Sequence, residues 1–176
     1  GIEIFSKLEG MFAFALYDQL INSTYLVRDQ SGIKPLYYST QDGKLIFASE
    51  VKAFKVTDYV FEEDKNWKTY FLSFGHIPHP FTTLNGVFSL PNSCFLKWDH
   101  ELATFKIEAF SEANRTVEII DNDKANSLIK DRLEKAVKCH LIADAPVGVF
   151  LSGGIDSSLL TLIADKFVGK NLKTLS

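Results

Sequence analysis

The residues with the clearest capacity for chemistry lie in the segment SGGIDSS, residues 152–158. Gly153 and Gly154 would let the backbone approach a ligand closely, while serine hydroxyls and helix amides would donate hydrogen bonds to phosphate oxygens. A carboxylate beside phosphate is repulsive unless a divalent cation lies between them, so Asp156 predicts Mg²⁺ held on the phosphates of a nucleotide. The segment is not a Walker A loop, because that loop's lysine and its G-x-x-x-x-G-K-S/T spacing are absent.

The same segment also fits a turn that binds nothing. Its glycines would then serve backbone geometry, and Asp156 with the serines would cap the first turn of a helix. Three serines, Ser152, Ser157 and Ser158, follow a fully apolar run and have no competing use. The pattern therefore favours phosphate binding.

The residues around this segment predict a βαβ unit. The apolar run PVGVFL, residues 146–151, is typical of a parallel strand covered on both faces. Residues 155–168 predict a helix that Gly169 ends, and residues 171–176 predict the next strand.

A longer amphipathic helix is predicted just upstream. Apolar residues repeat every three or four positions over residues 125–141, and Asp123 or a neighbour would cap the helix. The polar stretch 111–123 predicts a linker. The fold class is thus α+β over residues 1–110, followed by α/β over residues 124–176.

The first 110 residues predict short strands. Residues 11–18, MFAFALYD, are apolar on both faces, as expected of a strand inside a layered core, with a buried helical turn as the alternative. Other strands are predicted at 24–29, 35–40, 44–49, 93–99 and 103–110. The first four strands would form an antiparallel meander, with Asp42-Gly43 as one hairpin turn.

Two short helical segments are also predicted in this part. Ser49 would be the N-cap of a helical turn that includes Phe54. Residues 66–75 carry aromatic residues at helical spacing and end on Gly75, a suitable C′ residue.

Composition excludes several classes of protein. With 46% hydrophobic and 23% charged residues and a net charge of −3, the 176-residue chain is predicted to be globular. Lys and Arg are not clustered, which argues against nucleic acid as a partner. No apolar run reaches the roughly 18 to 20 residues of a membrane span, and no signal peptide is visible. The start at Gly1 and the end inside an expected strand suggest a piece of a longer protein.

The cysteines and histidines carry little chemistry. Cys94 and Cys139 cannot form a disulfide framework, which favours a cytoplasmic protein, and both are expected to be small buried hydrophobic residues. His76 and His79 lie among prolines without a Cys or carboxylate partner nearby, so a loop is favoured over a metal site.

The motifs resemble two modules of one enzyme family. SGGIDSS within ADAPVGVFLSGGIDSSLL is similar to the pyrophosphate-binding loop of the ATP-pyrophosphatase superfamily, and in particular of the glutamine-hydrolysing asparagine synthetases. LEGMFAFALYD, VRDQSGIKPLYY, FASEVKAF and GHIPHPFTTLNGVFSLPNSCFLKWD resemble the distal half of their class II glutamine amidotransferase domain. The resemblance implies the distal half of an αββα, N-terminal nucleophile type domain joined to the start of a parallel-sheet ATP-pyrophosphatase domain.

The resemblance also implies site residues. Asp29, in the R-D-x-x-G-x-x-P-L-Y run, would bind the α-amino group of glutamine, although a structural ion pair with Arg28 is an alternative. ATP would contact Leu151, through its backbone, and Ser152, Gly153, Gly154, Asp156, Ser157 and Ser158. Asp156 would hold Mg²⁺ through the ATP phosphates, so ATP and Mg are the expected cofactors.

The implied reaction has two steps. Glutamine would be hydrolysed to glutamate and ammonia, and ATP would adenylate aspartate, so that ammonia displaces AMP and gives asparagine. The alternatives are amidation of another carboxylate, on a sugar or a β-amino acid, and a non-catalytic relic. The N-terminal cysteine nucleophile of class II amidotransferases is not in this chain, so the chain alone is expected to be inactive. The resemblance is compatible with a homodimer.

Overall fold

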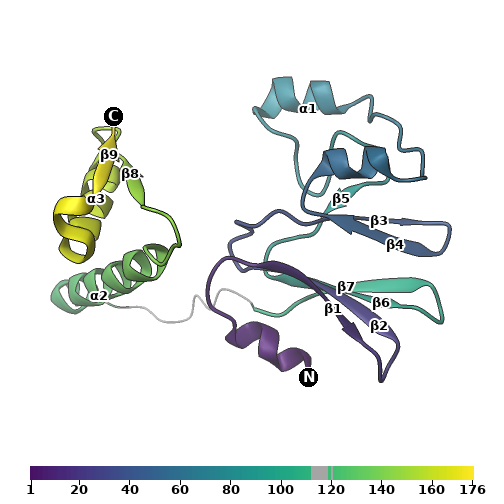
Figure 1. The fold of residues 1–176 in the computed structure, drawn as a ribbon, viewed down its shortest axis with the longest axis horizontal. Coiled ribbons are helices and arrows are strands. Elements are labelled where there is room, and N and C mark those ends of the chain that lie inside the picture. Colours follow the sequence, from purple (N-terminus) through teal and green to yellow (C-terminus); the bar gives the residue numbers. More distant parts are fainter. Residues whose placement is uncertain (112–118, 120) are drawn as a thin grey trace. The chain divides into compact units, whose positions relative to one another are not determined.

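The computed structural model describes residues 1–111, 119 and 121–176, which form two compact units, Gly1–Ala113 and Asn114–Ser176 (Figure 1). Most of the expected linker, residues 111–123, lies outside the described residues.

The first unit contains a four-stranded antiparallel sheet in the order β1-β2-β6-β7. Its strands are β1 (Ala13–Asp18), β2 (Ser23–Arg28), β6 (Cys94–Asp99) and β7 (Thr104–Ala109). In the central pair, Leu26 lies opposite Leu96, and both are fully buried.

A second, three-stranded antiparallel sheet has the order β4-β3-β5. Its strands are β3 (Tyr37–Gln41), β4 (Lys44–Ala48) and β5 (Phe88–Ser89). Asp42 and Gly43 join β3 to β4 with φ of 51° and 68°, which confirms the predicted hairpin turn. The expected four-strand meander is wrong, however, because the chain changes sheet between β2 and β3.

The two sheets face each other across an apolar core (Figure 1). That core contains Leu26, Leu36, Tyr38, Leu90, Leu96 and Trp98. On the outer face of the larger sheet, Tyr25 and Val27 pack against Phe5 of the 3₁₀ helix η1 (Ile2–Lys7). On the outer face of the smaller sheet, Phe54 of the 3₁₀ helix η2 (Val51–Val56) is fully buried. Because side chains alternate along a strand, each sheet presents apolar residues to both neighbouring layers.

Strand β1 is less enclosed than its sequence predicts. Leu16 is 46% exposed and Tyr17 is 58% exposed, so the expectation of a strand covered on both faces is wrong. The reason is position, because β1 lies at the edge of its sheet and pairs with β2 alone among the described strands.

Helix ends agree only partly with the predictions. Helix α1 (Trp67–Phe74) ends at Gly75, which has a φ of 73° and donates its N–H to Phe71 O, as predicted. The predicted Ser49 cap is wrong, because η2 follows Glu50 in extended conformation and has no side-chain cap. A 3₁₀ segment of this length is held by the packing of Phe54 rather than by a cap.

The second unit contains the predicted βαβ arrangement. Strands β8 (Gly148–Phe150) and β9 (Lys173–Leu175) pair in parallel, and helix α3 (Ile155–Val168) and the short η3 (Gly169–Asn171) connect them. Phe150 is nevertheless 81% exposed, so the expectation that this strand is covered on both faces is wrong. Among the described strands only β9 lies beside β8.

Helix α2 (Asn122–His140) precedes this unit's strands. Its N-cap is Asp121, a neighbour of the predicted Asp123, and its side chain accepts hydrogen bonds from the N–H groups of Asp123 and Lys124. None of the described helices combines the length and apolar character that crossing a bilayer requires.

Candidate functional site

The predicted phosphate-binding segment lies where β8 leads into α3. Leu151 continues the strand, and its N–H donates to Leu175 O at 2.7 Å. Gly153 follows with a φ of 79°, a left-handed conformation that favours glycine. Helix α3 then begins at Ile155, so the segment is a tight turn from the carboxyl end of a parallel strand into a helix.

The first turn of α3 offers backbone donors. Gly154 is the N-cap and provides no side-chain cap, and no described acceptor takes the N–H groups of Ile155, Asp156 and Ser157. The partial positive charge of a helix N-terminus adds to these donors. The turn therefore has the geometry of an anion-binding site.

Two of the serines are linked to each other. Ser152 Oγ lies 3.1 Å from Ser157 Oγ, which in turn donates to Gly154 O at 3.1 Å. A Cβ atom on Gly154 would lie 3.7 Å from Ser152 Oγ and 3.9 Å from Ser157 Oγ, so the glycine leaves the space beside the hydroxyls open. Ser158 belongs to the same helical turn, and its N–H donates to Gly154 O.

Asp156 stands apart from this serine pair. Its side chain is exposed on the first turn of α3, next to the free amides. Among the described residues, no group of three His, Cys, Asp or Glu side chains could hold a metal by itself. One carboxylate is nevertheless sufficient for Mg²⁺ bound chiefly through substrate phosphates, so the donor set fits the expected ion.

Asp29, the second predicted site residue, has no exposed surface. Its Oδ1 accepts the N–H groups of Ser31 at 3.1 Å and Ile33 at 3.0 Å, and its Oδ2 accepts the N–H of Lys34 at 2.9 Å. Its own backbone O accepts the N–H groups of Gly32 and Ser93. All these contacts are with the protein's backbone, which favours a structural role; binding of glutamine stays a prediction.

The protonation of Asp29 reflects these contacts. Burial by itself would raise the pKa of the carboxyl, but hydrogen bonds from the backbone N–H groups of Lys34, Ile33 and Ser31 favour the charged form more strongly. The net effect is a pKa below the ordinary value, so the side chain is a carboxylate at neutral pH.

Arg28 does not pair with Asp29, although the two are adjacent. Its Nε donates to Lys34 O at 2.9 Å and its Nη2 donates to Gly32 O at 2.8 Å. Its Nη1 donates to Ser89 Oγ at 3.0 Å and to Leu90 O at 2.6 Å. The proposed ion pair is therefore absent. Sequence reasoning could not find two of the four bonds, because their acceptors, Ser89 Oγ and Leu90 O, lie about sixty positions away.

Gly32 is required for both conformation and space. Its φ is 65°, and a Cβ atom there would lie 3.0 Å from Asn92 Cβ and 3.4 Å from Arg28 Cζ. We expect Gly32→Ala to lower the free energy of unfolding by about 2–4 kcal/mol, through backbone strain and overpacking. Urea denaturation followed by tryptophan fluorescence would measure this change.

Gly43→Ala is the matched control for that substitution. Gly43 has a similar φ of 68°, but a Cβ there would meet Ala103 Cβ at an ordinary 3.6 Å. It should cost only the strain of the conformation, about 1 kcal/mol. Equal losses in the two variants would show that crowding at Gly32 is unimportant.

The cysteines and the two loop histidines play no evident part in either site. Cys94 is partly buried on β6, and burial raises the pKa of its thiol. Cys139 is exposed, so its expected burial is wrong; the last turn of α2 is exposed on that side. His76 and His79 lie in the predicted loop, where burial and then the charge of Arg28 lower the pKa of His79.

Two family models match the chain in succession. The first, described as a glutamine amidotransferase domain, matches residues 1–110, and the second, described as asparagine synthase, matches residues 128–176. The matches follow the order in which the two motif sets occur, and the first covers more than half of the chain.

Curated relatives span both matches. "Asparagine synthetase [glutamine-hydrolyzing] 1" of Bacillus subtilis (strain 168) is 39% identical over 99% of this chain and 27% of its own length. "Asparagine synthetase B [glutamine-hydrolyzing]" of Escherichia coli (strain K12) is 29% identical over 98% of this chain and 26% of its own length. "Amidase chyE" of Penicillium rubens is 33% identical over 94% of this chain and 25% of its own length. The chain thus spans about a quarter of the length of these relatives.

Proposed function

Because the chain belongs to the glutamine amidotransferase domain family, we propose that it is part of a longer glutamine-dependent asparagine synthetase. The observation that supports the proposal is that one chain matches first a glutamine amidotransferase domain and then asparagine synthase, and that a relative named asparagine synthetase aligns with almost the whole chain. One module would supply ammonia and the other would activate a carboxylate.

The proposed reaction couples two sites. Glutamine is hydrolysed to glutamate and ammonia, ATP adenylates the side-chain carboxylate of aspartate with release of pyrophosphate, and ammonia displaces AMP to give asparagine. Adenylation is physically sensible because AMP is a far better leaving group than hydroxide. Donors placed around the departing pyrophosphate would stabilise the negative charge that grows on it.

The residues of the second unit have distinct proposed roles. The amides of the first turn of α3 and the hydroxyls of Ser152, Ser157 and Ser158 bind the phosphates of ATP, and Leu151 contributes backbone contacts. Gly153 and Gly154 allow the close approach. Mg²⁺, which would neutralise phosphate charge, is held by Asp156 together with phosphate oxygens.

In the first unit, we propose that Asp29 serves the glutamine side of the reaction. Its buried carboxylate fixes the backbone of the residues that follow it. We further propose that Asp29 contacts the α-amino group of glutamine directly. Such contact requires the buried Asp29 to become accessible when glutamine binds.

The proposed function also implies domain boundaries, a cellular compartment and an association state. Residues 1–110 would be the distal part of an αββα amidotransferase domain, residues 111–123 a linker and residues 124–176 the beginning of the synthetase domain. The protein would be cytoplasmic, its association state could be a homodimer, and the chain alone would be inactive, because the family's N-terminal cysteine is not among its residues.

A second candidate keeps both modules and changes the acceptor. The amidase relative of Penicillium rubens, 33% identical, carries a different name, so the acceptor could be a carboxylate other than that of aspartate. The reaction type and the proposed roles of the residues would stay the same.

One assay of the full-length protein tests both candidates. We expect glutamine, aspartate, ATP and Mg²⁺ to yield asparagine, glutamate, AMP and pyrophosphate in equal amounts. Release of AMP that depends on another carboxylate, without asparagine, would support the second candidate instead. If neither AMP nor glutamate appears with any carboxylate, the catalytic proposal fails.

A further inference from the structure

Residues 29–35, the 29–35 loop, lie between β2 and β3, and the side chains of Arg28, Asp29 and Asn92 form hydrogen bonds to their backbone. Asp29 accepts N–H groups from this loop, and Arg28 donates to the backbone oxygens of Gly32 and Lys34 within it. Asn92 Nδ2 adds a further bond, to Gln30 O at 3.0 Å. Of these two neighbouring residues, the Arg28 cation thus binds backbone carbonyl oxygens of the loop, and the Asp29 anion binds its backbone N–H groups.

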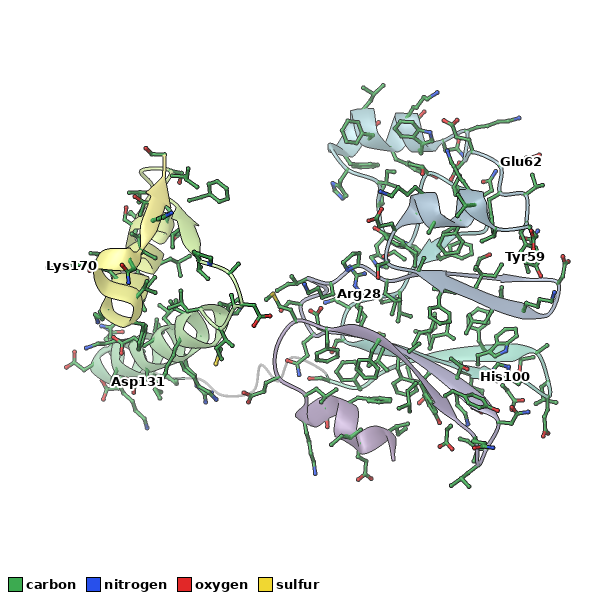
Figure 2. The ribbon with its side chains drawn as sticks, viewed as in Figure 1. Arg28, Tyr59, Glu62, His100, Asp131 and Lys170 are labelled. Atoms are coloured by element: carbon green, nitrogen blue, oxygen red, sulfur yellow. The ribbon has the colours of Figure 1, made fainter. Side chains whose placement is uncertain are left out.

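Arg28 also links the two sheets. It ends β2 in the four-stranded sheet, and its Nη1 reaches Ser89 of β5 in the three-stranded sheet and the adjacent Leu90. Figure 2 shows the Arg28 side chain between the two sheets. Among the described residues no carboxylate lies within ion-pair distance of the guanidinium, so its four bonds go to uncharged acceptors.

The backbone of the 29–35 loop is held in place, although most of the loop's side chains do not pack into the core. Its backbone is extensively hydrogen-bonded, yet Gln30, Ser31, Ile33 and Lys34 are all exposed, Ile33 by 53%. Ordering such a loop costs conformational entropy that burial of its side chains does not recover. A rigid loop with outward side chains is typical of a binding surface.

A hollow lies beside the loop. Lys34 and Pro35 line it together with residues 11–14 and Ser49, and its volume is about 420 Å³. That volume lies within the range of small-molecule pockets and is large enough for an amino acid. The position of this wall depends on the bonds that Arg28 makes to the backbone at Gly32 and Lys34.

We propose that Arg28 is a positioning residue for glutamine hydrolysis, acting by holding the 29–35 loop in place between the two sheets. The inference rests on the proposed amidotransferase function and deepens it. Arg28 itself need not contact glutamine, because its side-chain donors are engaged with backbone oxygens and Ser89. Its planar guanidinium places donors on three separate nitrogens and so spans these acceptors, whereas a lysine ammonium has its three donors on a single nitrogen.

Arg28→Lys in the full-length protein tests this role, with Arg132→Lys, the same exchange on an exposed position of α2, as control. Hydrogen exchange followed by mass spectrometry should show the 29–35 loop exchanging roughly tenfold faster, while β6 is unchanged. We expect kcat/KM for glutamine to fall by about tenfold or more, mainly through KM, because displacement of a positioning element weakens binding geometry. Synthesis from added ammonia should be unaffected.

Ser89→Ala provides a milder second variant, because it removes one acceptor and keeps the guanidinium. Its changes should have the same direction and a smaller size. The proposal is overturned if the loop exchanges at the wild-type rate in Arg28→Lys, or if the loop loosens while the glutamine kinetics stay unchanged. It is also overturned if ammonia-dependent synthesis falls in parallel, since that indicates general destabilisation.

Failure of the proposed function would look different. In that case the wild-type protein would release no glutamate from glutamine, whatever the variants do. The positioning role would then have no reaction to serve, and the exchange measurement would report only the structural effect of Arg28 on the loop.

Discussion

Replacing Asp156 by Ala in the full-length protein is expected to reduce ATP-dependent release of pyrophosphate by at least about 100-fold, the loss typical of removing one charge-stabilising group from an active site. The exposed carboxylate lies on the first turn of α3, beside amides that have no described acceptor. Without it, the Mg²⁺ that we propose would have no protein ligand next to the phosphates. Pyrophosphate release at saturating ATP, acceptor and ammonia measures the effect.

The controls for this prediction separate chemistry from folding. Hydrolysis of glutamine should survive in Asp156→Ala, because that reaction belongs to the other module. Asp165→Ala, an exposed acid near the other end of α3, should retain pyrophosphate release. Equal loss of both activities in Asp156→Ala would point to misfolding, and full pyrophosphate release would remove Asp156 from the proposed site.

Asp29→Asn is expected to lower the free energy of unfolding of the first unit by about 2–4 kcal/mol. The side-chain oxygen of the new asparagine can still accept hydrogen bonds. Its NH₂ group, however, would face a backbone N–H that donates to the Asp29 carboxylate in the wild type, such as that of Lys34 at 2.9 Å. A buried donor would then be left without an acceptor. Urea denaturation followed by tryptophan fluorescence reports on this unit, because Trp67 and Trp98 both lie in it.

Asp99→Asn is the matched control. Asp99 also accepts two backbone N–H groups, from Glu101 and Leu102, but at an exposed turn of the same sheet. Its replacement should cost less than about 1 kcal/mol. Both of its bonds end on Oδ1, an oxygen that asparagine keeps, so similar losses at the two positions would contradict the importance of the second, buried carboxylate oxygen of Asp29.

The effect of Asp29 should also depend on pH. Its folded pKa lies below the ordinary value, so in acid the unfolded chain takes up the proton first. The stabilisation is fully present above the unfolded pKa of about 3.9 and is lost as pH falls from there through the lower folded pKa. The difference in stability between wild type and Asp29→Asn should therefore shrink over that interval.

Kinetics with the same variant distinguish the two roles of Asp29. If the carboxylate binds the α-amino group of glutamine, Asp29→Asn should raise KM for glutamine far more than its loss of stability explains. If the carboxylate acts only on the backbone, the increase in KM should be in proportion to the faster hydrogen exchange of the 29–35 loop, as in Arg28→Lys. In both cases synthesis from ammonia stays intact.

Several features of the fold could be predicted because they depend on few neighbouring residues. Gly75 ends α1 because a left-handed residue is needed there, and Asp42-Gly43 forms a hairpin for the same steric reason. The turn at Gly153, between β8 and α3, follows from small residues placed between an apolar run and a helical pattern. The position of this turn, which we propose binds phosphate, was therefore predictable without any knowledge of tertiary contacts.

Other features were not predictable in this way. The apolar pattern of β1 indicated a doubly covered strand, but its place at the sheet edge leaves Leu16 and Tyr17 partly exposed. The apolar pattern of β8 likewise predicted a strand covered on both faces, but Phe150 is exposed. Periodicity reports which faces are apolar, whereas coverage depends on which strands lie alongside.

Local order of residue types thus specified the turn between β8 and α3, the end of α1 at Gly75 and the two-part organisation of the chain. The long-range partners of Arg28, Ser89 and Leu90, and the passage of the chain from one sheet to the other between β2 and β3 were decided only by the folded chain. The physical reason is that hydrogen bonds such as Arg28 Nη1 to Leu90 O join residues far apart in sequence. Every residue carries a backbone carbonyl acceptor, so residue type alone does not say which of them the Arg28 guanidinium will meet.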